Sequence, residues 1–120
     1  MAKILIVDDS LIMRGILRSM LEKGGHEIAG AASNGIDALR LYRELDPDLV
    51  TMDIHMAGGD GLSCLKEIIR LDADAKVIMI TALGHEEMKT EASRLGAVGY
   101  LCKPFKAEDI LAEIHKALAP

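Results

Sequence analysis

The sequence has almost no aromatic side chains: two tyrosines, one phenylalanine and no tryptophan in 120 residues. A platform for stacking the bases of single-stranded nucleic acid is therefore not expected. Positive charge is also in deficit, because 14 lysines and arginines stand against 19 acidic residues and leave a net charge of −5. A protein with a net negative charge repels the phosphate backbone of a nucleic acid. The composition thus predicts a protein that binds no nucleic acid.

Cysteines are few and lie far apart in the sequence. Cys64 and Cys102 form no Cys-x-x-Cys motif, and no histidine pair accompanies them at metal-ligand spacing. This pattern argues against both a zinc site and a disulfide framework. We expect two reduced thiols, with Cys102 buried in a strand.

Long hydrophobic runs are absent as well. The first apolar run, residues 4–7, ends at Asp8 and is too short for a signal peptide, and no later run could span a bilayer. We therefore expect a cytoplasmic protein with no membrane contact. The length of 120 residues suits one domain covering residues 1–120.

The sequence does contain a series of short aliphatic runs, each bounded by Gly, Pro, Asp or Asn. Such runs are typical of strands buried on both faces of a parallel sheet. Between them, apolar residues recur at helical spacing, for example at Met13, Ile16, Leu17 and Met20. Strand and helix therefore alternate, which predicts an α/β domain with a doubly wound, five-stranded parallel sheet. The predicted strands are residues 4–7, 28–32, 49–52, 77–80 and 98–102.

Chemically active side chains follow four of these strands. The residues that come directly after the first, third, fourth and fifth strands are Asp8 with Asp9, Asp53, Thr81 and Lys103. The carboxyl ends of parallel strands share one edge of the sheet, where open α/β folds bind ligands. Three carboxylates gathered there repel one another unless a cation or a proton intervenes. Oxygen ligands without thiolates favour Mg²⁺, for which Mn²⁺ should substitute.

A lysine and a hydroxyl beside such a cation are suited to a phosphoryl group. Lys103 offers positive charge, and Thr81 offers a hydrogen-bond donor to the phosphoryl oxygens. Asp53 can attack phosphorus to form an acyl phosphate, since an ionised carboxylate needs no general base. The sequence therefore predicts phosphoryl transfer to Asp53.

The active residues stand within four longer motifs: Val7-Asp8-Asp9-Ser10, Asp53-Ile54-His55-Met56 with Gly61, Thr81-Ala82 and Lys103-Pro104-Phe105. These motifs closely resemble the receiver domain of two-component response regulators, and the resemblance covers essentially the whole chain. Two further segments, Asp8-Asp9-Ser10 followed by Met13-Arg14 and Thr51-Met52-Asp53-Ile54, carry a finer likeness. It is to the chemotaxis branch of that family, either its stand-alone regulator or, as the alternative, a receiver cut from a larger regulator such as the methylesterase.

The resemblance implies a fold and a metal site. The fold is flavodoxin-like, (βα)5, with strand order 2-1-3-4-5. Asp53 would be the phosphoacceptor, and Mg²⁺ would be bound by Asp9, Asp53 and the main-chain carbonyl of His55. Asp8 would act on the metal through water.

The resemblance also implies a switch. Thr81 and Lys103 would hold the phosphoryl oxygens, and the Lys103–Pro104 peptide bond would be cis. Thr81 would move towards the phosphoryl group, and Tyr100 would turn inward on activation.

The implied partners are proteins. A sensor histidine kinase or a phosphotransfer domain would supply the phosphoryl group, and a downstream target would bind the face formed by the fourth helix, the fifth strand and the fifth helix. The chain would be a monomer and no enzyme beyond self-catalysed phosphotransfer and autodephosphorylation.

One segment departs from the family pattern. Ala57 follows Met56 where the family usually has proline, and Gly58-Gly59 comes next. A glycine-rich loop loses more conformational entropy when it becomes ordered. We therefore predict that this loop is mobile without metal or phosphate.

Two other functional classes use related chemistry. Haloacid-dehalogenase-like phosphatases also have an Asp nucleophile with Mg²⁺, but they carry a second acid two residues later, where this chain has His55. A flavodoxin-like electron carrier needs a hydroxyl- and glycine-rich phosphate loop after the first strand, and Asp8 and Asp9 would repel that phosphate. Both readings are therefore less favoured than a receiver.

Overall fold

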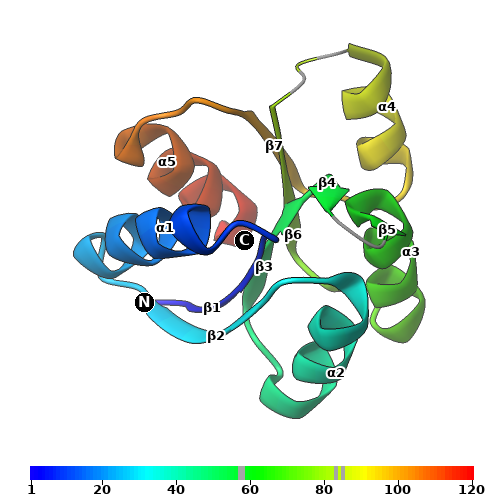
Figure 1. The fold of residues 1–120 in the computed structure, drawn as a ribbon, viewed down its shortest axis with the longest axis horizontal. Helices are drawn as coiled ribbons and strands as arrows, with labels where there is room; N and C mark the ends of the chain where they lie inside the picture. Colours follow the sequence, from blue (N-terminus) through cyan, green and yellow to red (C-terminus); the bar gives the residue numbers. More distant parts are fainter. Residues whose placement is uncertain (57–58, 83, 85) are drawn as a thin grey trace.

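Strands and helices alternate along the chain (Figure 1) in a computed structural model that describes residues 1–56, 59–82, 84 and 86–120. The strands are β1 (Lys3–Val7), β2 (Glu27–Ala32), β3 (Leu49–Asp53), β4 (His55–Met56), β5 (Gly59–Asp60), β6 (Val77–Thr81) and β7 (Gly99–Cys102). The helices are α1 (Leu11–Lys23), α2 (Gly35–Leu45), α3 (Gly61–Leu71), α4 (Glu86–Arg94) and α5 (Ala107–Leu118). All five predicted strands are confirmed, because each aliphatic run forms a strand.

Five of the strands form one parallel sheet in the order β2-β1-β3-β6-β7. Numbered along the chain among themselves, these strands have the order 2-1-3-4-5, so the predicted fold is confirmed. The sequence did not predict β4 and β5, an antiparallel pair of two-residue strands that follows β3. Strands this short contain too few residues to show a periodic pattern.

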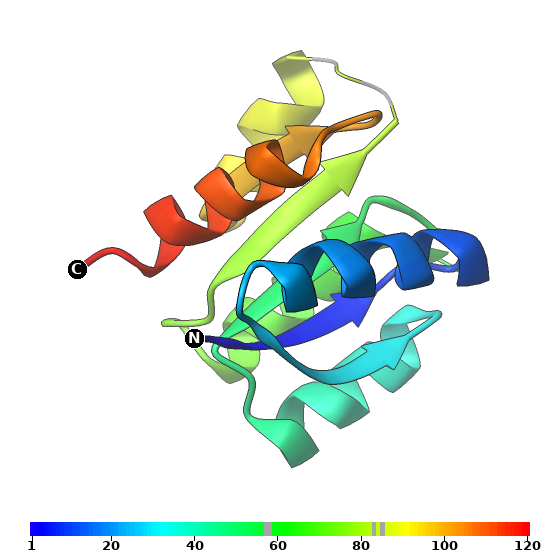
Figure 2. The same ribbon diagram turned by 90° about the vertical axis from the view of Figure 1, so that its left-hand side faces the viewer.

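Helices cover both faces of the sheet. Helices α1 and α5 lie on one face and α2, α3 and α4 on the other, as Figure 1 shows from one side and Figure 2 from another. Side chains along β1 alternate between the two cores: Ile4 and Ile6 pack with α1 and α5, whereas Leu5 and Val7 pack with the other three helices. Burying one such side chain contributes about 1.5–3 kcal/mol. The described helices include none that is long and apolar enough to cross a membrane.

The two edge strands differ from the prediction. The prediction that strand residues are buried on both faces of the sheet is confirmed for β1, β3 and β6. In the edge strands β2 and β7, most residues are partly buried or exposed. Cys102, predicted to be buried, is exposed, and both cysteines are free. The physical reason is that β7 has a neighbour on one side only and that α4, beside it, buries a single residue, Ala92.

Side-chain caps fix the beginnings of the helices that follow the acidic loops. The Ser10 hydroxyl accepts a hydrogen bond from the Met13 N–H at 3.1 Å, and α1 begins there. The Asp60 carboxylate accepts one from the Ser63 N–H at 2.8 Å, and α3 begins there. Each cap satisfies a main-chain donor that the helix cannot pair. The sequence thereby sets short, defined connections after β1 and after the β4–β5 pair.

Candidate functional site

Three carboxylates meet at the carboxyl edge of the sheet. One oxygen from each of Asp8, Asp9 and Asp53 lies within 4.8 Å of the others. Asp8 and Asp53 are buried, with 1% and 5% of their surfaces exposed, whereas Asp9 is exposed. Like charges at this separation are unfavourable without a cation, above all when water is excluded. The predicted clustering is confirmed, and an all-oxygen donor set suits a hard divalent ion such as Mg²⁺.

Lys103 brings positive charge to the cluster from the end of β7. Its Nζ atom lies 3.2 Å from Asp8 Oδ2 and 3.6 Å from Asp53 Oδ1. The Lys103 N–H donates a hydrogen bond to the Thr81 carbonyl at 2.7 Å, and the Lys103–Pro104 bond is cis, as the resemblance implies. One ammonium group does not balance three carboxylates, so this group of side chains remains anionic.

Burial and neighbouring charges both act on the Asp53 carboxylate. Burial raises its pKa above the ordinary value, and repulsion from Asp8 raises it further. Attraction to Lys103 and a hydrogen bond from the His55 main chain oppose these effects, while Asp9 adds to them. A cation bound here would stabilise the ionised form, which is also the nucleophilic form.

Asp8 is held at three points. Its Oδ1 atom accepts a hydrogen bond from the Ser10 N–H at 2.9 Å, and its Oδ2 atom accepts one from Lys103 at 3.2 Å. Its main-chain oxygen accepts a hydrogen bond of 2.7 Å from the Arg14 guanidinium. Both carboxylate oxygens of Asp8 therefore have protein partners, and one of them also belongs to the group of oxygens that could hold a metal ion.

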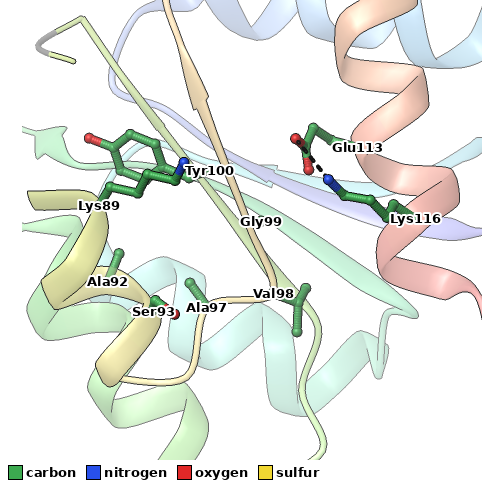
Figure 3. A pocket seen from close by; sticks show the side chains of 9 residues that line it. All are labelled: Lys89, Ala92, Ser93, Ala97, Val98, Gly99, Tyr100, Glu113 and Lys116. Atoms are coloured by element: carbon green, nitrogen blue, oxygen red, sulfur yellow. Dashed lines mark ion pairs between the residues drawn. The ribbon is translucent and has the colours of Figure 1, made fainter. Parts of the chain in front are cut away.

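The remaining predicted residues lie around this cluster. Thr81 is buried at the end of β6, where its register partner on β7 is Cys102. The His55 side chain is exposed, as befits a residue expected to act through its main chain. Tyr100 is half-buried and lines a hollow of about 220 Å³ between α4, β7 and α5 (Figure 3). None of the residues that line this hollow belongs to the acidic cluster.

The sequence analysis named two residues that contact the site, Arg14 and Gly61, only as parts of motifs. Arg14 makes the contact with Asp8, and Gly61 starts α3 directly against the main chain of Asp53 and Ile54. The Gly61 N–H donates a hydrogen bond of 2.6 Å to the Ile54 carbonyl. In the sequence, the one feature that could have indicated this close approach is a glycine directly after Asp60, the acid that caps α3. Of the loop 57–59 that is predicted to be mobile, residues 57 and 58 lie outside the described residues, whereas Gly59 belongs to β5 and pairs with Met56.

The sequence pattern of the response regulator receiver domain matches residues 4–115. The chain belongs to this family. Chemotaxis protein CheY of Bacillus subtilis is 45% identical to this receiver domain over 116 residues, which are 97% of each protein. One chain of the crystal structure of the CheX–CheY–BeF₃–Mg²⁺ complex from Borrelia burgdorferi has a TM-score of 0.96 and 32% identity, over 98% of this receiver and 90% of that chain.

The receiver domain is also similar to the response regulator domain of Thermotoga maritima CheB, with a TM-score of 0.88 and 33% identity over 98% of each chain. The greater identity is to CheY, and the chain is a chemotaxis-like phosphoacceptor response regulator of two-component signalling. CheY-like receiver domains are signalling modules, and the family binds Mg²⁺. The acidic cluster fits that ion.

A buried hydroxyl of the receiver domain offers a test of the strand that carries Asp53. Thr51 is fully buried in β3, and its Oγ1 atom has no hydrogen-bond partner among the described residues. We expect Thr51→Val to raise the free energy of unfolding by roughly 1 kcal/mol, because the methyl group keeps the shape and removes an unsatisfied polar group. Urea denaturation measures this change. A loss of stability of that size would show that the hydroxyl forms a favourable interaction.

Proposed function

We propose that this receiver domain accepts a phosphoryl group on Asp53 and thereby changes its affinity for a protein target. The observation that carries the proposal is the position of Asp53 between like and unlike charges. Its carboxylate lies in the cluster with Asp8 and Asp9, and its Oδ1 atom lies 3.6 Å from Lys103 Nζ. This arrangement combines a nucleophile with groups that suit an incoming phosphoryl group and its metal.

The chemistry follows from these positions. An Asp53 oxygen attacks the phosphorus of a phosphohistidine or of a small acyl phosphate. The bond from phosphorus to the donor atom breaks, and the donor leaves with its electron pair. Lys103 and the Thr81 hydroxyl then stabilise the charge on the phosphoryl oxygens. Hydrolysis of the acyl phosphate returns the carboxylate, so the domain needs no further catalytic group.

The metal site uses oxygen atoms next to the reacting carboxylate. Asp9, Asp53 and the main-chain carbonyl of His55 would hold Mg²⁺, and Asp8 would act through water. Mg²⁺ supplies positive charge that neutralises the charge developing on the phosphoryl oxygens. Mn²⁺ should substitute for Mg²⁺, because it also prefers oxygen ligands in octahedral geometry.

The proposed setting is a cytoplasmic two-component pathway. Residues 1–120 would act as one monomeric receiver domain that takes its phosphoryl group from a sensor histidine kinase or a phosphotransfer domain. It would have no enzymatic activity beyond its own phosphorylation and dephosphorylation, and no nucleic-acid partner. A receiver within a methylesterase is the alternative, which the likeness to CheB supports less strongly than the identity to CheY supports the stand-alone regulator.

We further propose that the target binds the face formed by α4, β7 and α5. Tyr100 and Lys89 line the hollow on this face, together with the Glu113–Lys116 ion pair of 3.8 Å (Figure 3). Helix α4 buries only Ala92, so little apolar packing opposes a shift of this helix. A phosphoryl group adds about −1.5 to −2 charge near Thr81, and this charge can bias Tyr100 and α4 towards one of two arrangements.

Two-dimensional NMR with beryllofluoride and Mg²⁺ tests this output face. We expect amide shifts not only around Asp53 but also at Met88, Tyr100 and Ile110. Thr81→Ala should retain the shifts around Asp53 and reduce the distant ones, because it removes the hydroxyl that links phosphate to β6. Thr90→Ala makes the same chemical change at an exposed position of α4 and should leave the distant shifts intact. Shifts confined to the Asp53 region in the unmodified protein would contradict the proposed face.

A further inference from the structure

Arg14 makes an unusual contact for a helix-surface arginine. Its Nη1 atom donates a hydrogen bond of 2.7 Å to the main-chain oxygen of Asp8, in a partly buried position. The contact spans six residues and leaves the helix to reach the end of β1. The next arginine of α1, Arg18, instead lies 3.8 Å from Glu22 on the exposed surface of the same helix. Arg14 therefore contacts the acidic loop, whereas Arg18 does not share this contact.

The contact fixes a peptide unit of the candidate metal site. The Asp8 carbonyl and the Asp9 N–H belong to the same planar peptide group. A donor that holds the Asp8 carbonyl oxygen therefore restrains the orientation of the whole peptide group, including the Asp9 nitrogen. The Asp8 carboxylate is already held by Ser10 and Lys103, so the guanidinium supplies the restraint on the main-chain side. Asp9 is exposed, and its main chain begins at this peptide group.

We propose that Arg14 is a positioning residue for the acidic cluster: through the Asp8 carbonyl it orients the Asp8–Asp9 peptide, and so keeps the Asp9 carboxylate within reach of Asp53. This inference rests on the proposed Mg²⁺ site. Removing a group that orients metal ligands typically lowers metal affinity by about 10–100-fold.

The positive charge of Arg14, taken alone, predicts the opposite change in Mg²⁺ affinity when Arg14 is replaced. A guanidinium near the site repels a divalent cation, so removing its charge should strengthen Mg²⁺ binding modestly. Positioning predicts weaker binding, because Asp9 then samples orientations that do not ligate. The direction of the change in Mg²⁺ affinity therefore distinguishes the two roles of Arg14.

The test is a Mg²⁺ titration of three proteins, followed by NMR through the amide signals of Asp9 and Ile54. Arg14→Met should raise the dissociation constant for Mg²⁺ by about 10-fold or more. Arg18→Met removes the same charge one turn along α1 and should leave the constant near that of the unmodified protein. Unchanged or tighter binding by Arg14→Met would overturn the inference. Absence of saturable Mg²⁺ shifts in the unmodified protein would instead overturn the proposed metal site, and the inference with it.

A second measurement separates positioning from loss of folding. In the metal-free proteins, the Asp9 amide should exchange its hydrogen faster in Arg14→Met than in Arg18→Met, while amides of β3 keep the same protection in both. Equal exchange at Asp9 in the two variants would contradict a positioning role. Loss of β3 protection in Arg14→Met would show a global role for Arg14 and would likewise overturn the proposal.

Discussion

Asp53→Asn should incorporate no phosphoryl group from acetyl phosphate and Mg²⁺. The amide is a poor nucleophile, and removing the attacking group of an enzyme slows its reaction by roughly 10³-fold or more. Intact-protein mass spectrometry detects the added mass of one phosphoryl group on the unmodified protein. Asp9→Ala should still be labelled, but more slowly and only at higher Mg²⁺ concentration, because it retains the nucleophile and loses a proposed ligand.

The matched control for this prediction is Asp60→Asn. It makes the same change of charge on the segment that follows Asp53, and asparagine retains the ability to cap α3. We expect it to be labelled as fast as the unmodified protein. Undiminished labelling of Asp53→Asn would show that another residue accepts the phosphoryl group.

Gly61→Ala should damage both the fold and the site. A Cβ atom at residue 61 would overlap the carbonyl oxygen of Asp53 and lie 2.9 Å from Ile54 Cα, and both contacts are with main chain. Relief requires α3 or the end of β3 to move, at a cost of about 1–3 kcal/mol in the free energy of unfolding. A displacement of Asp53 by about 1 Å should slow phosphorylation by roughly 10²-fold.

Gly15→Ala provides the comparison for Gly61→Ala. Gly15 lies within α1, and an added Cβ atom would meet no atom within 4 Å apart from its chain neighbours and the nearby backbone of its own helix. Alanine there should stabilise the protein by about 0.5–1 kcal/mol, because glycine is the poorer helix former. Urea denaturation measures both variants, and labelling with acetyl phosphate measures the site. A Gly61→Ala protein as stable as the unmodified one would show that α3 can move away from Asp53 at little cost.

The sheet and the acidic cluster could be predicted from the sequence because each rests on a local pattern. Aliphatic runs predict buried strands, and the residues directly after the runs must lie at the carboxyl edge of a parallel sheet. Asp8, Asp9, Asp53 and Lys103 therefore come together for topological reasons, whatever the details of their side chains. The strand order itself came from the family resemblance.

The remaining features depend on packing between distant segments. The exposure of Cys102 follows from how incompletely α4 covers an edge strand, which the composition of β7 does not reveal. The contact of Arg14 with a carbonyl depends on a side-chain direction, because helical spacing alone does not distinguish Arg14 from Arg18. The close approach of Gly61 to Asp53 depends on where α3 meets β3. The sequence contains the glycine, but it does not show that the main chain of Asp53 lies against it.

The most direct test of the account is to locate the phosphoryl group in the unmodified protein. Borohydride reduces an acyl phosphate and converts the phosphorylated aspartate to homoserine, which peptide mass spectrometry can place in the sequence. After treatment with acetyl phosphate and Mg²⁺, we predict homoserine at position 53 and aspartate at positions 8, 9 and 60. Homoserine at another of these positions, or an unreduced phosphoryl group on His55, would contradict the assignment of Asp53 as the phosphoacceptor.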